Sequence, residues 1–252
     1  MKRLLFRIGL LGLTVYAGIC LIVFFFQRSL IYFPGAVPAA GPHTLKLDLG
    51  DRSLHVAARP RETPQAILYF GGNAEDVAYT LAEFSAAFPE HAVYLMYYRG
   101  YGGSLGRPTE PGLHADAQAL FEWVHHRHPQ VIVVGRSLGS GIAIQLAAHQ
   151  DVARLVLVTP FDSLLNIAKR QFPFLPVGPL RLDKYESWRI APQVSAKTQI
   201  IAAAHDEIIP LANTRRLAEA FRPGVATLHI LAGATHNDLS TTGEYPALIL
   251  TD

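Results

Sequence analysis

The chain alternates short apolar runs with longer amphipathic stretches from about residue 54 onward. Unbroken Val, Ile and Leu runs are typical of parallel strands, because both faces of such strands are covered. The expected strands are 54–58, 66–70, 92–97, 131–134, 155–158, 199–203 and 227–231. The expected helices, where apolar side chains recur at helical spacing, are 74–87, 111–126, 138–148 and 211–221. The pattern predicts an α/β fold, a mostly parallel sheet with helices on both faces.

A different pattern precedes this body. Residues 8–26 are apolar apart from Thr14 and Tyr16, and a helix of this length extends about 28 Å, close to the thickness of a hydrocarbon core. A cleaved signal peptide is the main alternative, but its apolar region is usually shorter. The run ends Phe24-Phe25-Phe26-Gln27-Arg28 without a small-x-small cleavage pattern. An uncleaved signal anchor is therefore favoured over cleavage, and over a buried core helix.

The basic residues around the apolar run predict its orientation. Lys2, Arg3 and Arg7 precede it, whereas Arg28 stands nearly alone after it. The positive-inside bias places the N-terminus in the cytosol. We expect residues 1–28 to form a single-pass membrane anchor and residues 29–252 to form one domain on the far, periplasmic or extracytoplasmic, side. A connecting stretch rich in Pro and Gly, residues 34–42, follows the anchor.

Composition narrows the function classes. The net charge of +2 arises from interspersed charges without a basic run in the body, which argues against nucleic acid as a partner. The single cysteine, Cys20, lies inside the apolar run, so the body forms no internal disulfide and no cysteine-ligated metal site. The tract Trp123 to His128 contains three histidines, but we interpret it as a solvated helix end. We expect no metal and no cofactor.

One stretch, residues 161–189, does not fit the alternation and is rich in aromatic residues and proline. It predicts a short lid over whatever site the sheet builds. Its aromatic residues Phe172, Phe174, Tyr185 and Trp188 are expected to serve packing more than binding, although a lid over an acyl pocket would use the same residues.

The pattern Gly-x-Ser-x-Gly occurs twice, around Ser104 and around Ser137. A nucleophilic serine needs a strand that stops abruptly, a strained turn, and a helix whose N-terminal N–H groups face the developing oxyanion. Ser137 has the apolar run 131–134 before it and the helix 138–148 after it. Ser104 follows a Gly-rich stretch and runs into Arg107-Pro108, where a helix cannot start. We therefore predict Ser137 as the nucleophile and Ser104 as a loop residue.

A serine hydroxyl needs a histidine base and an acid that orients the histidine, in the chain order Ser, Asp or Glu, His. His236 follows the last predicted strand, at the carboxyl end of the sheet where ligand sites form, whereas His229 lies inside that strand. Asp206 is the predicted acid, because it follows the strand 199–203. Glu207 and Asp162 remain alternative acids.

The expected oxyanion donors are two backbone N–H groups. One belongs to Leu138, the residue after the nucleophile, and the other to the loop after the strand 66–70. That loop is Gly71-Gly72-Asn73, from which we select Asn73.

Taken together, these segments resemble a known family. The motifs are the segment Gln27 to Pro34 after the membrane helix, Tyr98 to Gly102, Gly135 to Gly141, the turn around Asp206, and Gly233 to Leu239. They are similar to the membrane-anchored α/β-hydrolase-domain proteins, a group that includes protein depalmitoylases and lysophospholipase-like enzymes. The resemblance implies the α/β-hydrolase fold, supports Ser137, Asp206 and His236 position by position, and implies that residues 98–102 form a structural loop near the site.

Two departures from the family pattern stand out. Relatives carry His-Gly-Asn-Ala-Gly where this chain has Gly71-Gly72-Asn73-Ala74-Glu75, so the oxyanion loop lacks a histidine and gains a carboxylate. The tail after Asp238 is also short for the usual last helix.

These observations predict a serine hydrolase that cleaves a carboxylic ester or thioester through an acyl-enzyme, without a cofactor. Location and resemblance favour an acylated lipid or a lipidated protein as the substrate. Two alternatives stay open: an aminopeptidase-like peptide hydrolase on the same triad, and a catalytically impaired hydrolase-fold binding protein. The altered loop motivates the second alternative.

Overall fold

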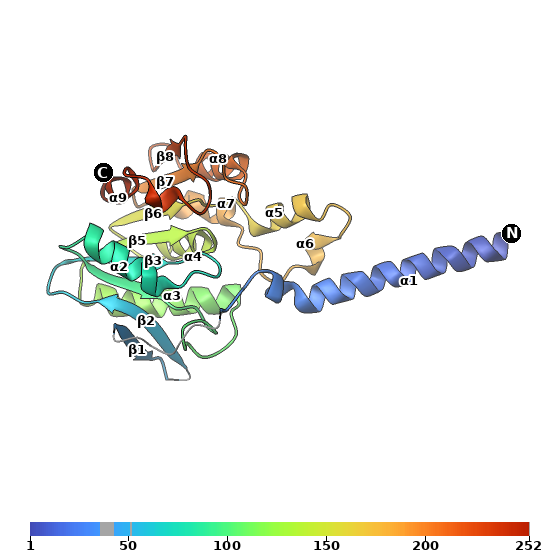
Figure 1. Cartoon of the computed structure of the whole chain (residues 1–252), viewed down its shortest axis with the longest axis horizontal. Helices are drawn as coiled ribbons and strands as arrows, with labels where there is room; N and C mark the ends of the chain where they lie inside the picture. The colour runs from blue at the N-terminus through green and yellow to red at the C-terminus, as the bar shows by residue number, and fades with distance from the viewer. Residues whose placement is uncertain (36–42, 51, 252) are drawn as a thin grey trace.

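The sheet at the centre of the body has eight strands in the computed structural model, which describes residues 1–35, 43–50 and 52–251. Their order is β1-β2-β4-β3-β5-β6-β7-β8 (Figure 1). The strands β3 to β8 pair in parallel, whereas β2 pairs with β1 and with β4 in antiparallel fashion. The predicted α/β fold with a mostly parallel sheet is confirmed.

The seven predicted strands are present, each shifted by at most one or two residues at its ends. The strands are β1 (Thr44–Asp48), β2 (Ser53–Arg59), β3 (Gln65–Phe70), β4 (Ala92–Met96), β5 (Gln130–Arg136), β6 (Arg154–Val158), β7 (Thr198–Ala203) and β8 (Ala226–Leu231). The sequence did not predict β1, because this edge strand alternates Leu45 and Leu47 with polar residues and buries only Leu47. The predicted connecting stretch cannot be compared over residues 36–42, which lie outside the described residues.

The predicted N-terminal apolar helix and the four predicted amphipathic helices are all present, and the remaining helices lie in segments without a clear helical pattern. The helices are α1 (Lys2–Phe26), α2 (Val77–Ala87), α3 (Glu110–His125), α4 (Leu138–Ala147), α5 (Leu164–Gln171), α6 (Val177–Leu180), α7 (Ser187–Ile190), α8 (Leu211–Ala220) and α9 (Tyr245–Leu250). The helix α2 begins three residues later than predicted, because the Asp76 side chain caps it by accepting a hydrogen bond from Ala78 N. The residues between β3 and that cap form a loop at the carboxyl end of β3.

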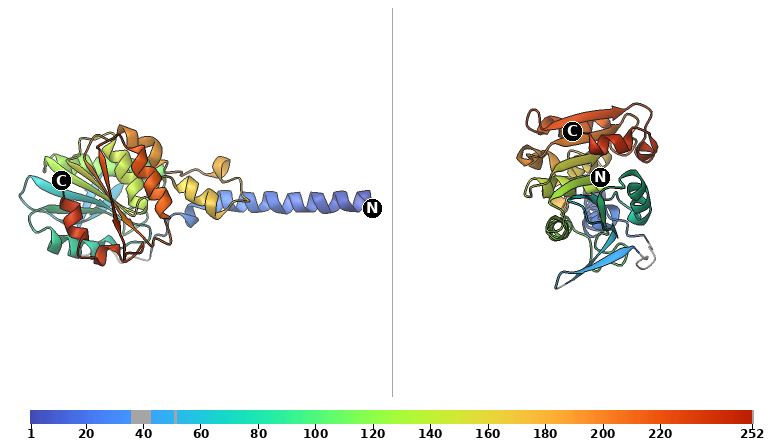
Figure 2. Two further views of the ribbon diagram at one scale, coloured as in Figure 1. Left: turned by 90° about the horizontal axis from the view of Figure 1, so that it is seen from above. Right: turned by 90° about the vertical axis from the view of Figure 1, so that its left-hand side faces the viewer.

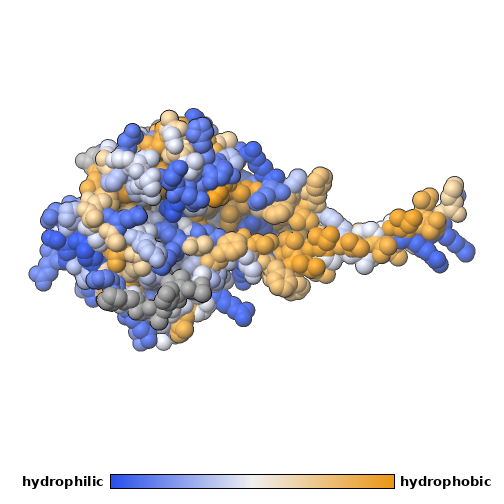
Figure 3. All heavy atoms as spheres, viewed as in Figure 1, coloured by the Kyte–Doolittle hydropathy of each residue, from blue (hydrophilic) through white to orange (hydrophobic). Residues whose placement is uncertain are grey.

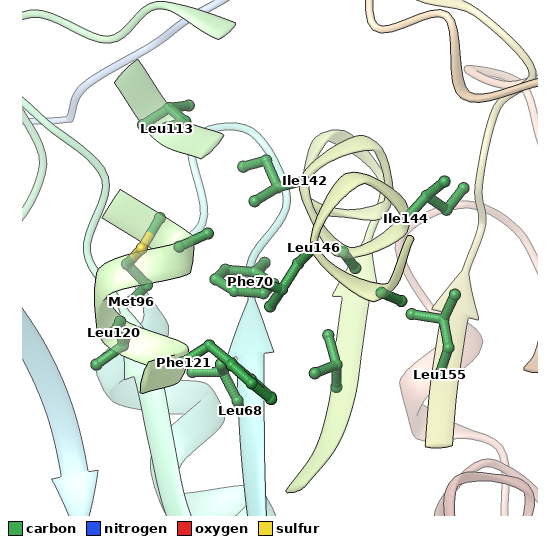
Figure 4. Packing of buried hydrophobic residues seen from close by; sticks show 14 of the residues in the cluster. Leu68, Phe70, Met96, Leu113, Leu120, Phe121, Ile142, Ile144, Leu146 and Leu155 are labelled. Atoms are coloured by element: carbon green, nitrogen blue, oxygen red, sulfur yellow. The ribbon is translucent and has the colours of Figure 1, made fainter. Parts of the chain in front are cut away.

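Helices cover both faces of the sheet (Figures 1 and 2). On one face, α3, α4 and α8 pack on alternate side chains of the strands, and Figure 4 shows α3 and α4 contributing Leu120, Phe121 and Ile142 around Phe70. On the other face, α2 and α9 pack on the intervening side chains. The short tail therefore still supplies a last helix, anchored by buried Tyr245 and Ile249.

The helix α1 projects from the body, and its side chains are mostly exposed (Figures 1 and 2). Within the described part of the chain, the helical segment Lys2–Leu30, which includes the short 3-10 turn η1 (Gln27–Leu30), is the single one long and apolar enough to cross a membrane. The predicted lid, residues 161–189, contains α5, α6 and all but the last residue of α7. It lies beside the end of α1 that joins the body.

Close packing of α4 on the sheet requires glycine at position 139. A Cβ atom built on Gly139 would overlap the Phe70 carbonyl at the end of β3. The helix therefore reaches the carboxyl end of β3 only because this side chain is a hydrogen atom.

We expect Gly139→Ala to lower the free energy of unfolding by about 1–3 kcal/mol, because the added methyl group forces α4 away from β3. Denaturant unfolding of the full chain measures this loss. The matched control is Gly243→Ala, whose added Cβ meets no atom within 4 Å. Equal unfolding midpoints for the two variants would contradict the close approach.

Candidate active site

Ser137 occupies a strained turn between β5 and α4. Its φ of 48° and ψ of −115° lie outside the regions that non-glycine residues ordinarily adopt. Hydrogen bonds hold the turn: Ser137 N donates to Val158 O at 2.9 Å, and Ser140 N donates to Ser137 O at 3.0 Å. The strand-turn-helix context predicted for Ser137 is thus present, and it presents the serine at the carboxyl end of the sheet.

The structure brings Ser137, His236 and Asp206 into one hydrogen-bonded chain. The Oγ atom of Ser137 lies 3.1 Å from His236 Nε2, and His236 Nδ1 lies 2.8 Å from Asp206 Oδ2. The imidazole and the carboxylate are only 5% and 3% exposed. With Nδ1–H donating to the carboxylate, Nε2 is left as an acceptor for the serine hydroxyl proton.

The Asp206 carboxylate is oriented by its own loop. Its Oδ1 atom accepts hydrogen bonds from Ile208 N at 3.0 Å and from Ile209 N at 2.6 Å. These bonds fix the carboxylate after β7, with Oδ2 directed at the imidazole. The histidine loop is fixed in the same way, because Asp238 Oδ1 accepts a hydrogen bond from Thr235 N at 2.6 Å.

The two alternative acids have other partners. The fully buried Asp162 carboxylate accepts hydrogen bonds from Asn213, Asn166 and Arg216. Glu207 accepts a hydrogen bond from the backbone N–H of His236 at 3.4 Å, not from its ring. Neither carboxylate competes with Asp206 for Nδ1.

The rival serine and histidine are structural. The buried Ser104 hydroxyl accepts a hydrogen bond from His55 N and donates one to Tyr97 O, each at 2.9 Å. His229, inside β8, donates from Nε2 to Gln199 Oε1 at 2.7 Å. Ser104 thereby ties its loop to the neighbouring β2, as expected for a loop residue.

The two predicted oxyanion donors lie next to the serine. Leu138 is the first residue of α4, where no carbonyl of the helix accepts its N–H. Asn73 lines the same cavity as Ser137 and Leu138. The Asn73 side chain is fixed by Ile31 O, by Phe33 N at 3.1 Å and by Tyr101 OH at 3.1 Å.

The segment 98–102 packs against this loop, as the family resemblance implies. The Tyr98 hydroxyl donates to Gly71 O at 2.6 Å, and Tyr101 holds the Asn73 side chain. Burial, followed by the charge of Glu75, raises the pKa of Tyr98 well above its ordinary value. The hydroxyl therefore stays protonated and remains a donor to the loop.

Glu75, the carboxylate that departs from the family pattern, pairs with Arg136, a partner that was not predicted from the sequence. The carboxylate of Glu75 accepts hydrogen bonds from Gly72 N at 2.6 Å and from Arg136 at 3.2 Å, and the guanidinium also donates to His236 O at 3.3 Å. Tyr69 and Thr80 complete the shell around the carboxylate. This pair connects the loop after β3, the serine turn and the histidine loop.

Burial opposes the charge on Arg136, but the adjacent Glu75 carboxylate, together with Tyr69 and Tyr245, outweighs this effect, so the pKa of Arg136 is raised. For Tyr69, burial and then the same carboxylate raise the pKa well above its ordinary value. Arg136 therefore remains charged and Tyr69 remains a donor. The sequence does contain a signal for this pair. An acidic residue, Glu75, follows the glycines of one turn, and a basic residue, Arg136, lies in the glycine-rich turn of the serine.

A cavity of about 680 Å³ opens beside Ser137, within the size range of small-molecule sites. Its walls come from four parts of the chain: the loop after β3 with the serine turn, the predicted lid, the end of α1 with η1, and residues 207–213 between β7 and the first turn of α8. The lining contributed by α1 and the residues after it is Val23, Gln27, Leu30 and Ile31.

The histidine tract after α3 is only partly solvated, so our prediction was wrong for His128. This side chain is buried and hydrogen-bonds Tyr94 OH at 2.9 Å and Thr63 O at 2.7 Å, whereas His125 and His126 are exposed. Over the residues that the structure describes, no group of three or more His, Cys, Asp or Glu side chains is placed to hold a metal ion.

Comparisons with known proteins support the fold. The family model described as "Alpha/beta hydrolase family" matches residues 68–249. The uncharacterized protein Rv2307c of Mycobacterium tuberculosis is 33% identical over 89% of this chain and 85% of its own length. The alpha/beta hydrolase domain-containing protein aho-3 of Caenorhabditis elegans is 30% identical over 71% of this chain and 54% of its own length. The esterase Pf2001 of Pyrococcus furiosus, 16% identical, superposes with a TM-score of 0.70 over 86% of this chain and 96% of that chain.

We expect Glu75→Ala to lower the free energy of unfolding by about 2–3 kcal/mol, because it leaves the largely buried Arg136 without its carboxylate. Thermal and denaturant unfolding measure the change. The exposed pair Arg61–Glu90, 3.6 Å apart, supplies the control, since Glu90→Ala should cost less than about 1 kcal/mol.

The double variant Glu75→Ala with Arg136→Met should recover part of the loss, because no unpaired charge then remains at the site. A cost for Glu75→Ala no larger than that for Glu90→Ala would show that the Glu75–Arg136 pair does not hold the site together.

Proposed function

Because this chain belongs to the alpha/beta hydrolase family, we propose that it hydrolyses carboxylic esters or thioesters through an acyl-enzyme formed on Ser137. The observation that supports this proposal is the hydrogen-bonded chain from Ser137 Oγ through His236 to Asp206. In this proposal Ser137 is the nucleophile, His236 the general base and then acid, and Asp206 the residue that orients and stabilises the imidazolium.

The reaction would run in two halves. In the first, Ser137 Oγ attacks the substrate carbonyl carbon while its proton passes to His236 Nε2, and the tetrahedral intermediate collapses as Nε2 returns the proton to the departing alcohol or thiol. In the second, water attacks the acyl-enzyme with the same histidine as base, which releases the carboxylic acid and restores the serine.

The oxyanion would be bound by the N–H groups of Leu138 and Asn73. The position of Leu138 at the helix N-terminus adds the favourable end of the α4 dipole. The carboxylate in the altered loop accepts the N–H of Gly72, which leaves the next N–H along the chain, that of Asn73, as the proposed donor. The loop thus has a fixed shape without the histidine that relatives carry.

The proposed substrate is an acylated lipid or a lipidated protein. Two observations support it: the cavity beside Ser137 has apolar walls from the predicted lid, and α1 with η1 contributes to the same lining. We further propose that residues 1–28 act as an uncleaved signal anchor, with the N-terminus cytosolic because of Lys2, Arg3 and Arg7, and that residues 29–252 form the hydrolase domain outside the cytosol.

A fluorophosphonate probe should label the full chain, and Ser137→Ala should abolish the labelling. Ser104→Ala is the matched control, because Ser104 sits in the same Gly-x-Ser-x-Gly pattern but has a buried, doubly hydrogen-bonded hydroxyl; it should still be labelled. Labelling lost in Ser104→Ala and kept in Ser137→Ala would overturn the assignment. No labelling of the folded wild-type chain would favour a binding protein instead.

A substrate panel separates the ester and peptide activities. We expect the detergent-solubilised full chain to hydrolyse acyl esters and thioesters of graded chain length, and kcat to fall by at least about 10⁴-fold in Ser137→Ala. Preferential cleavage of aminoacyl amides would contradict the proposal and favour a peptidase.

A further inference from the structure

The segment 172–180, Phe-Pro-Phe-Leu-Pro-Val-Gly-Pro-Leu, contains no polar side chain. It lies on the predicted lid between α5 and the end of α6. The lid packs on itself through a small cluster of its own, Leu165, Ala168 and Val177. The aromatic side chains of the segment stay outside that cluster, with Phe172 44% exposed and Phe174 87% exposed.

This segment runs alongside the apolar helix α1. The Tyr16 hydroxyl donates to Phe174 O at 2.9 Å, and Gln27 Nε2 donates to Leu180 O at 2.9 Å. Tyr16 and Gln27 are eleven positions apart, so the contact extends about 16 Å along the helix axis. Figure 3 shows the apolar surface of α1 continuing onto the neighbouring part of the body.

The backbone of the segment is suited to an apolar medium. In lipid, each unpaired backbone N–H or C=O costs free energy because no water is available to bond it. Three of the nine residues are prolines and have no N–H. The N–H groups of Phe172, Leu175 and Val177 donate to backbone carbonyls nearby. The two contacts with Tyr16 and Gln27 satisfy further carbonyls.

The flanks of the segment are polar and hold its ends. Lys169 and Arg170 precede it and are exposed, and Arg181 follows it. Long basic side chains at the ends of an apolar segment reach the phosphates of a membrane surface. On the anchor side, Arg28 forms an ion pair with Asp183 at 2.9 Å, and the buried Gln27 amide accepts a hydrogen bond from Leu182 N at 2.8 Å. The lid is therefore fixed to the end of α1.

We propose that residues 172–180 insert beside α1 into the membrane leaflet nearer the body, so that the cavity at Ser137 takes its acyl substrate directly from the bilayer. Entry from the bilayer requires the lid, α1 and the nucleophile to share one cavity. The cavity is lined by Ser137, by the lid residues Phe172 and Leu175, and by Val23 of α1. This inference rests on the membrane anchoring and the ester hydrolysis proposed above. Its substrate is a lipid or lipidated chain whose tail stays in the leaflet while its ester or thioester group reaches Ser137.

Insertion is tested with spin labels on the full chain in phosphatidylcholine–phosphatidylglycerol vesicles, in a Cys20→Ala background. The label is placed by Phe174→Cys, and the matched aqueous control is Tyr79→Cys, another exposed aromatic position at 77% exposure on α2. Leu11→Cys on α1, 66% exposed, is the lipid control. Relaxation by oxygen, which concentrates in lipid, is compared with relaxation by a water-soluble nickel chelate.

We expect the oxygen-to-nickel ratio at position 174 to be several-fold higher than at position 79 and to approach that at position 11. If the ratio at position 174 equals that at position 79 while the ratio at position 11 is high, the insertion is overturned and the anchoring stands. Oxygen-to-nickel ratios at positions 174 and 11 that are both as low as at position 79 overturn the anchoring and the insertion together. None of these outcomes depends on hydrolysis.

Delivery from the bilayer is tested by Phe174→Asp, a position outside the cavity lining, with Tyr79→Asp as the control. Because a carboxylate opposes insertion, Phe174→Asp should lower hydrolysis of a long-chain ester in vesicles by about tenfold. Hydrolysis of a soluble short-chain ester should change by less than about twofold, as expected for a surface substitution away from the site. Unchanged rates on both substrates, or equal losses on both, overturn the proposal. Absence of hydrolysis by the wild-type chain refutes the proposed function, while the spin labels still decide the insertion.

Discussion

The approach of α4 to the end of β3 at Gly139 is the contact on which the site depends. A helix N-terminus, a strained serine and a loop from a neighbouring strand meet only because no Cβ separates α4 from the Phe70 and Gly71 carbonyls. Once α4 is seated, the N–H of Leu138 and the loop after β3 face the same cavity. The loops after β7 and β8 reach this point because parallel strands end at one edge of the sheet.

Much of this arrangement could be predicted from the sequence. Most of the strands are short runs rich in Val, Ile and Leu, so seven of eight strands were found, and each predicted triad residue follows one of these strands. Local context also separated the two serines, since Arg107-Pro108 blocks a helix after Ser104 whereas apolar runs flank Ser137. Chain order left His229 and His236, of which only His236 lies beyond the last predicted strand. Loop placement then selected Asp206 over Glu207 and Asp162.

The features that escaped prediction depend on contacts between distant residues. The edge strand β1 lacks an apolar run because one of its faces meets solvent. The Glu75–Arg136 pair joins residues 61 positions apart, and Gln27 reaches Leu180 across 153 positions. His128 was expected in solvent, yet the fold places it against Tyr94. No periodicity in a single segment encodes such partners.

The hydrogen bonds from Tyr16 and Gln27 to the lid make the sequence of the N-terminal helical segment matter, beyond its length and hydropathy. A membrane helix used only as a tether is interchangeable with any other of similar length and hydropathy. Here Tyr16 of α1 and Gln27 of η1 bond the lid, and Val23 of α1 lines the cavity, so the helical segment is part of the tertiary structure of the body. The residues that follow it, Ile31 and Phe33, hold Asn73 in place. Selection on this helix would therefore act residue by residue, as it does on a core, and not on hydropathy alone.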